Sequence, residues 1–212
     1  MIKNDKIILT DCDGVCLDWE VAFMHWCQHN GMVPVEDWKL KYKVSERFNV
    51  PYEDGKRLTN QFNSSASIGF LPPLRDAQWY IKLLAEKYGY KFVAVTSLHT
   101  DPYAQNLRTQ NLKKLFGEDT FIEYHYLGCG DDKDEILEEL SHKYSGAPWI
   151  EDKPINAQCG ANFGFESYLV EHGHNMTAKG DYTVVKNWEE LTYWLVHRTE
   201  ASKIPMGIRY ED

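Results

Sequence analysis

The sequence lacks the features that mark several large classes of protein. No apolar run is long enough to span a membrane, and there is neither an internal repeat nor a low-complexity segment. The five cysteines are odd in number and scattered along the 212 residues, which fits reduced thiols better than a disulfide framework. These absences favour a cytoplasmic globular protein with no membrane partner.

Basic residues are also in the minority. Lys and Arg number 23 against 32 Asp and Glu, which gives a formal net charge of -9 at pH 7. A general nucleic-acid binder usually presents a basic face, so a nucleic-acid partner is disfavoured. A small anionic ligand is still compatible with this charge, because local donors and a metal ion can hold it. Residues 1–5 lead straight into an apolar run, so we expect no signal peptide.

Short apolar runs alternate with helical patterns over most of the chain. This alternation predicts an α/β fold with a mainly parallel sheet and helices on both faces. The helices are expected at 19–30, 75–88, 101–116, 131–144 and 188–197. The strands are expected from residue 7 up to Asp11 and at 91–97, 121–127, 147–150, 165–170 and, as a short edge strand, 182–185.

Residues 19–70 differ from the rest of the chain in their residue types and hydrophobic pattern. Aromatic residues are mixed with charges there, and no strand pattern appears after the first helix. We therefore predict a small helical cap at 19–70, with two or three helices after the first, inserted into an α/β core made of 1–18 and 71–212. Such a cap would cover the carboxyl edge of the sheet.

Polar side chains follow several of the predicted strands. The carboxyl ends of parallel strands form one edge of an α/β sheet, where ligands bind. Carboxylates there suit Mg²⁺, and hydroxyls with a lysine suit a phosphate. A metal and a lysine facing one carboxylate would make it a nucleophile toward phosphorus. Taken singly, these residues also fit turns, helix caps or solvated charges. The polar side chains expected at this edge are Asp11 and Asp13, Thr96 and Ser97, Lys133, and Glu151 and Asp152.

In their order along the chain, these segments resemble the four motifs of the haloacid dehalogenase superfamily. The resemblance runs from about residue 6 to 170 and implies a Rossmann-like sheet, a helical cap, Mg²⁺ and an aspartyl-phosphate intermediate. An acid at position 13 favours phosphatases over the dehalogenase branch. The segments are Asp11-Cys12-Asp13-Gly14-Val15, Val95-Thr96-Ser97, Lys133 and Ile150-Glu151-Asp152.

The resemblance also implies a role for each motif residue. Asp11 would be the nucleophile and a metal ligand. Asp13 would be the general acid and then the base, and would give a backbone oxygen to the metal. Asp152 would bind the metal directly, and Glu151 directly or through water. The phosphate would be held by Thr96, Ser97 and Lys133.

A narrower resemblance is to the 5'(3')-deoxyribonucleotidases. It rests on residues 13–19, 70–74 and 150–154. In that family an aromatic residue at the position of Trp19 packs on the nucleobase, although Trp19 is equally compatible with a core role. Cap aromatics complete that family's pocket, and Trp38 and Phe70 are the candidates here. Glu151 departs from the family, which usually has Asp at that position.

These observations predict a Mg²⁺-dependent phosphomonoester hydrolase, most simply a 5'-nucleotidase. The alternatives are a phosphatase for a sugar phosphate, another small phosphoester or a nucleic-acid end, and a non-catalytic module that binds a phosphorylated ligand. The segment His172-Gly173-His174 is interpreted as a loop rather than a metal site. The apolar positions of helix 188–197 are expected to pack on the sheet, with a homo-oligomer contact as the alternative.

Overall fold

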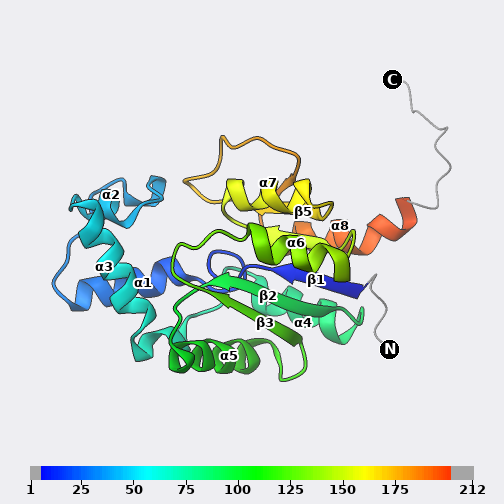
Figure 1. Ribbon diagram of the computed structural model, residues 1–212, viewed down its shortest axis with the longest axis horizontal. Coiled ribbons are helices and arrows are strands. Elements are labelled where there is room, and N and C mark those ends of the chain that lie inside the picture. The colour runs from blue at the N-terminus through cyan, green and yellow to red at the C-terminus, as the bar shows by residue number, and fades with distance from the viewer. Residues whose placement is uncertain (1–5, 202–212) are drawn as a thin grey trace.

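A single parallel sheet forms the centre of the molecule. The structure, a computed structural model, describes residues 6–201. The strand order is β3-β2-β1-β4-β5-β6, and every neighbouring pair is parallel (Figure 1). This arrangement confirms the predicted Rossmann-like α/β class. The strands are β1 (Ile7–Thr10), β2 (Lys91–Ser97), β3 (Phe121–Leu127), β4 (Pro148–Glu151), β5 (Glu166–Val170) and β6 (Thr183–Val185).

The central strands β1 and β2 each contain a continuous apolar run, because both of their faces are covered. Neighbouring residues of β1 alternate between two clusters, with Ile8 in one and Ile7 and Leu9 in the other. Strand β2 alternates in the same way. A strand buried on both faces reads as a continuous hydrophobic run, so the sequence pattern located these strands well.

Two layers of helices cover the sheet (Figure 1). Helices α6 and α7 pack together beside β4 and β5 on one face, and α4, α5 and α8 form the other layer. None of the described helices is long and apolar enough to cross a membrane. The core helices are α4 (Ala77–Glu86), α5 (Pro102–Phe116), α6 (Asp134–Lys143), α7 (Pro154–Asn162) and α8 (Trp188–Ala201).

The segment 19–70, which we call the cap, contains helices and 3-10 turns only. It lies to one side of the sheet in Figure 1. Helices α2 and α3 pack closely, and a side chain at Gly55 would fall 2.6 Å from the Ser45 backbone nitrogen. The cap elements are α1 (Trp19–His29), η2 (Trp38–Leu40), α2 (Val44–Phe48), α3 (Tyr52–Asn63) and η3 (Ala66–Phe70).

The sequence pattern missed one helix and placed the start of another too early. Helix α7 was not predicted, because its segment is rich in Asn, Gln and Gly and has little apolar periodicity. Tertiary packing stabilises it: Gly160 lies so close to Trp149 that a Cβ would approach the ring to 2.2 Å. Helix α6 begins at Asp134 rather than Asp131, since the Asp131 side chain accepts a hydrogen bond from the Gly128 amide in the preceding turn.

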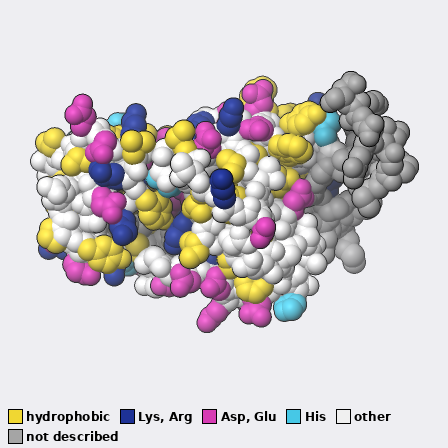
Figure 2. Space-filling model, turned by 90° about the horizontal axis from the view of Figure 1, so that it is seen from above, with side chains coloured by type: hydrophobic (Ala, Val, Ile, Leu, Met, Phe, Trp, Pro, Cys, Tyr) yellow, Lys and Arg dark blue, Asp and Glu magenta, His cyan; other side chains and the backbone are white. Residues whose placement is uncertain are grey.

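Surface charge follows the composition. On the face shown in Figure 2, basic and acidic side chains are interspersed and no continuous basic area appears. Three of the four apolar positions noted in α8, Trp188, Leu191 and Leu195, are buried inside the molecule, whereas the fourth, Trp194, is 47% exposed. This confirms that the helix packs on the sheet.

Candidate active site

The loop after β1 carries the two acids that open the site. The Asp11 amide donates to the Ile150 carbonyl, so the pairing of β1 with β4 continues one residue beyond the strand. The chain then turns at Gly14, whose φ is +72°. A Cβ on Gly14 would lie 2.4 Å from Asp152 Oδ2. Glycine is therefore needed both for the turn and for the close approach of Asp152.

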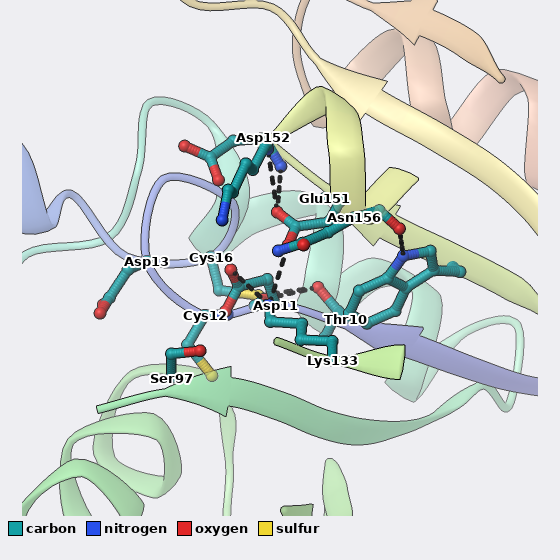
Figure 3. A network of polar contacts seen from close by, with 12 residues as sticks. Thr10, Asp11, Cys12, Asp13, Cys16, Ser97, Lys133, Glu151, Asp152 and Asn156 are labelled. Carbon is teal, nitrogen blue, oxygen red and sulfur yellow. Dashed lines mark hydrogen bonds and ion pairs between the residues drawn. The ribbon is translucent and has the colours of Figure 1, made fainter. Parts of the chain in front are cut away.

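Asp11 lies at the base of the site beside a lysine (Figure 3). Its Oδ2 is 2.8 Å from Lys133 Nζ, and its Oδ1 accepts a hydrogen bond from the Cys12 amide at 2.6 Å. Burial raises the pKa of Asp11 to about 6 against the opposing charge of Lys133, while Glu151 and Asp13 raise it further. The position therefore holds more negative charge than Lys133 alone can neutralise.

Glu151 is fully buried and fixes Lys133. Its Oε1 accepts from Lys133 Nζ at 2.9 Å and from Asn156 Nδ2 at 2.6 Å. Its Oε2 accepts from the backbone amides of Asp152 and Lys153 at 2.6 and 3.0 Å. Burial by itself would raise the pKa of Glu151, but Lys133 and these hydrogen bonds lower it to about 2. Glu151 is thus ionised, and each of its oxygens already accepts two hydrogen bonds.

Three carboxylates converge at this edge of the sheet. Asp11, Glu151 and Asp152 each offer an oxygen, and these oxygens lie within 4.8 Å of one another. Burial, together with the charges of Glu151 and Asp11, raises the pKa of Asp152 well above its usual range. Oxygen donors with excess negative charge fit a hard divalent cation, so this cluster can hold a metal ion.

Asp13 is turned away from that cluster and pairs with an arginine. Arg108 Nη1 lies 2.7 Å from Asp13 Oδ1, and Arg108 Nη2 donates to Oδ2 at 3.3 Å. The Arg108 side chain is fully buried, whereas that of Asp13 retains 21% exposure. Burial raises the pKa of Asp13, and Arg108 opposes this rise. In Figure 3 the Asp13 carboxylate lies apart from the pair formed by Lys133 and Glu151.

Known proteins provide an independent comparison. No protein-family model matches the chain. A curated relative, an uncharacterized 32.4 kDa protein of the Gp30-rIII intergenic region of Enterobacteria phage T4, is 34% identical over 152 residues. The alignment covers 68% of this chain and 53% of the relative, so the chain spans about half the length of the curated relative it matches.

Solved structures with the same architecture are more informative about the fold. A D,D-heptose 1.7-bisphosphate phosphatase from B. bronchiseptica, complexed with magnesium and phosphate, matches with a TM-score of 0.56 and 13% identity over 91% of this chain and 99% of its own. A haloacid dehalogenase-like hydrolase from Streptococcus pneumoniae matches with a TM-score of 0.61 and 16% identity, covering 90% and 99%. The L-2-haloacid dehalogenase from Xanthobacter autotrophicus, with chloropropionic acid covalently bound, has a TM-score of 0.55 and 12% identity, covering 90% and 98%.

The chain has the fold of the haloacid dehalogenase superfamily. That part of the resemblance found in the sequence is confirmed at the level of the fold. The solved structures include both phosphatases and dehalogenases, so the fold does not decide between these reactions. The narrower resemblance to 5'(3')-deoxyribonucleotidases stays a prediction.

Within the haloacid dehalogenase fold, a cavity of about 340 Å³ lies between the cap and the edge of the sheet. Its core side includes most of the predicted site residues, namely Asp11, Asp13, Ser97, Lys133, Glu151 and Asp152. Thr96 is fully buried and does not line this cavity, and its hydroxyl has no hydrogen-bond partner among the described residues. The role predicted for Thr96 in holding phosphate stays a prediction.

The cap contributes a different set of aromatics from the one expected. Trp19 lines the cavity, donates its indole N–H to Asn63 Oδ1 at 2.8 Å and stacks on Phe23. Trp38 and Phe70 do not line the cavity, and Phe70 is 72% exposed. Tyr42 and Tyr52 line it instead. The two earlier candidates therefore do not contribute to this cavity, since Trp38 packs against the core cluster and Phe70 faces solvent.

Two further contributors escaped the sequence analysis, since Arg108 and Asn156 supply partners to Asp13 and Glu151. The segment 172–174, which was expected to be a loop, lines the cavity with His172 and His174. The sequence contained a pattern that could have identified Arg108. It lies four residues from both Ala104 and Leu112, on the buried face of α5. A charge on such a face needs a buried partner.

Proposed function

We propose that this protein is a Mg²⁺-dependent phosphomonoester hydrolase that acts through an aspartyl-phosphate on Asp11 and prefers nucleoside monophosphates. The observation that carries the proposal is the position of Asp11. Its carboxylate lies 2.8 Å from Lys133 Nζ and within 4.8 Å of oxygens of Glu151 and Asp152. A nucleophile, a fixed cation and the donors of a cation site therefore share one edge of the sheet.

In the proposed reaction, a carboxylate oxygen of Asp11 attacks phosphorus and the bond from phosphorus to the ester oxygen breaks. Asp13 donates a proton to the departing oxygen, which leaves as an alcohol. Asp13 then takes a proton from water, whose oxygen attacks the phosphoaspartate and releases phosphate and free Asp11. To act, Asp13 must exchange its contact with Arg108 for one with the substrate.

Positive charge makes the attack by one anion on another feasible. Lys133, held by Glu151, neutralises the attacking carboxylate and the phosphoryl oxygens. Mg²⁺ would be held by Asp11, Asp152 and the Asp13 backbone oxygen, and when bound it supplies further charge neutralisation. In this scheme Glu151 fixes Lys133 and adds negative charge at the cation site, where four hydrogen-bond donors hold its carboxylate in place.

The cavity supports a small phosphorylated substrate. Its volume of about 340 Å³ lies in the range of small-molecule sites. Trp19 lines it, so a planar base on the substrate can meet an indole ring. The magnesium and phosphate of the heptose bisphosphatase structure fit the same chemistry on the same fold. The five cysteines are free, in keeping with the predicted cytoplasmic location.

The central test is phosphate release from nucleoside monophosphates, sugar phosphates and an aryl phosphate, each with Mg²⁺ and with chelator. We expect metal-dependent release, and a loss of at least about 1000-fold in kcat for Asp11→Asn because the nucleophile is gone. Asp132→Asn, an exposed acid beside Lys133, is the matched control and should retain wild-type rates. Full turnover in Asp11→Asn would overturn the mechanism, and halide release from a 2-haloacid without phosphate release would favour a dehalogenase.

The nucleotide preference has a separate test. Trp19→Ala should raise KM for nucleoside monophosphates more than for ribose 5-phosphate, and the ratio of the two effects is insensitive to partial unfolding. Trp26→Ala is the control, because Trp26 packs in the same aromatic cluster without lining the cavity. Equal effects on both substrates would refute a stacking role for Trp19.

A further inference from the structure

The loop after β5 is tied to the candidate site by side-chain hydrogen bonds. Asn175 Nδ2 donates to the carbonyls of Val170 and Asp152 at 2.9 and 2.8 Å, and its Oδ1 accepts from the His172 amide. His172 Nε2 lies 2.7 Å from the Gly14 carbonyl. The loop is therefore fixed to the ends of β4 and β5 and to the turn after β1.

The same loop touches the cap. A Cβ on Gly173 would lie 2.7 Å from the Lys39 carbonyl oxygen, so the two backbones approach as closely as glycine allows. The ring of Tyr42 lies 5.1 Å from that of His174, which in turn stacks on His172 at 5.4 Å. Tyr42 thus reaches from the cap to a residue of the core loop.

His174 is the member of this loop with an unused polar atom. Its side chain is only 9% exposed, and its Nε2 has no hydrogen-bond partner among the described residues. Asp152 Oδ2 lies 3.9 Å away, just beyond hydrogen-bond distance. A buried nitrogen without a partner is unfavourable, and a small movement of Asp152 toward the imidazole would satisfy it.

We propose that His174 is a positioning residue for Asp152, and that Tyr42 braces its ring. The inference rests on the cation site of the proposed function. An Nε2–H donated to Asp152 fixes the carboxylate and leaves its other lone pairs for the cation, as outer hydrogen bonds do at metal sites. The affinity of the core for a divalent cation then depends on Tyr42, a residue of the cap.

The test is direct binding of Mn²⁺ to the full-length, metal-free protein, measured by EPR or calorimetry without substrate. His174→Phe keeps the ring but removes the donor, and it should weaken Mn²⁺ binding about tenfold. His174→Gln places an amide nitrogen near the position of Nε2 and should restore most of that affinity. Tyr42→Leu should weaken binding about twofold or more, because neighbouring residues couple.

Two comparisons separate positioning from general damage to the fold. Tyr52→Leu alters another exposed cap tyrosine that lines the cavity and should leave Mn²⁺ affinity unchanged. Tyr42→Leu should have no further effect in a His174→Phe background, since Tyr42 acts through His174.

The outcomes also distinguish this inference from the proposed function. Wild-type Mn²⁺ affinity in His174→Phe, or a loss that His174→Gln does not repair, would overturn the positioning role, even in an active phosphatase. Absence of Mn²⁺ binding in the wild-type protein would overturn it too. The expected losses in a protein that releases no phosphate would support the positioning role and refute the hydrolase instead.

Discussion

The pair formed by Asp13 and Arg108 makes the candidate general acid a structural residue as well. Arg108 is completely buried, and Asp13 is the only carboxylate in residues 6–201 within ion-pair distance of its guanidinium. Arg108 Nε has no hydrogen-bond partner in that range either. Asp13→Asn would therefore leave a buried positive charge without its counter-charge.

The expected magnitude follows from this burial. Removing one partner of a buried ion pair costs about 3–5 kcal/mol. Water reaches the 21% of the Asp13 side chain that is exposed, so we expect the lower end, about 3 kcal/mol. For a chain of 212 residues this corresponds to a fall in Tm of about 6–12 °C. Asp11→Asn should lose no stability at pH 7.5, because Lys133 keeps Glu151 as a partner and the raised pKa of Asp11 means that its charge is unfavourable in the metal-free fold.

Urea unfolding of the metal-free protein at pH 7.5 is the assay, with wild type, both single variants and Asp13→Asn/Arg108→Met compared. The double variant replaces the charge with an apolar side chain of similar length and should recover most of the lost stability. An unchanged urea midpoint for Asp13→Asn would refute the reasoning, as would a double variant no more stable than the single one. Activity losses in Asp13→Asn must be read beside its folded fraction.

Two other expectations concern the cation site. In metal-free protein, the raised pKa of Asp11 contributes stability that is present below about pH 3.8 and is lost as the pH rises to about 6. The lowered pKa of Glu151 contributes stability that is present above about pH 4.5 and is lost as the pH falls to about 2. Thermal melts of the metal-free protein should therefore show a Tm that falls from pH 4.5 to 6. Mg²⁺ should raise Tm at pH 7.5 but not at pH 4.5. A Tm that does not change with pH would contradict this reasoning. Gly14→Ala would put a Cβ 2.4 Å from Asp152 Oδ2 and should weaken Mn²⁺ binding at least about tenfold. Gly31→Ala, at φ +75° with no heavy atom within 4 Å, should show only the backbone strain, and equal binding in the two variants would exclude the steric effect.

The sequence predicted most of the fold because the strands are buried on both faces. A continuous apolar run such as 92–95, between segments with helical periodicity, has few alternatives to a buried strand. Helix α7 was missed because its stability comes from contacts at Asn156 and Gly160 rather than from periodicity. Local pattern and tertiary packing supply separate information, and only the first is visible in the sequence.

The site was predictable where chemistry sits at strand ends, and unpredictable where it depends on the partner of a side chain. The position of Asp11, Lys133 and Asp152 at one edge of the sheet was predictable because parallel strands end there, and their roles stay predictions. The hydrogen bonds that occupy Glu151 and the contact of His174 with Tyr42 depend on loop and cap packing. No spacing in the sequence encodes which side chains those loops bring together.

The charge balance of the site links its pKa shifts to its proposed cation. Four carboxylates, on Asp11, Asp13, Glu151 and Asp152, face two cations, those of Lys133 and Arg108, which leaves an excess of two negative charges. Without a metal, the raised pKa values of Asp11 and Asp152 show that protons would offset this excess. A divalent cation offsets it without protonating the nucleophile. In the proposed reaction a phosphate monoester brings further negative charge, so we expect the cation to bind before or with the substrate, because the site without a cation would repel it.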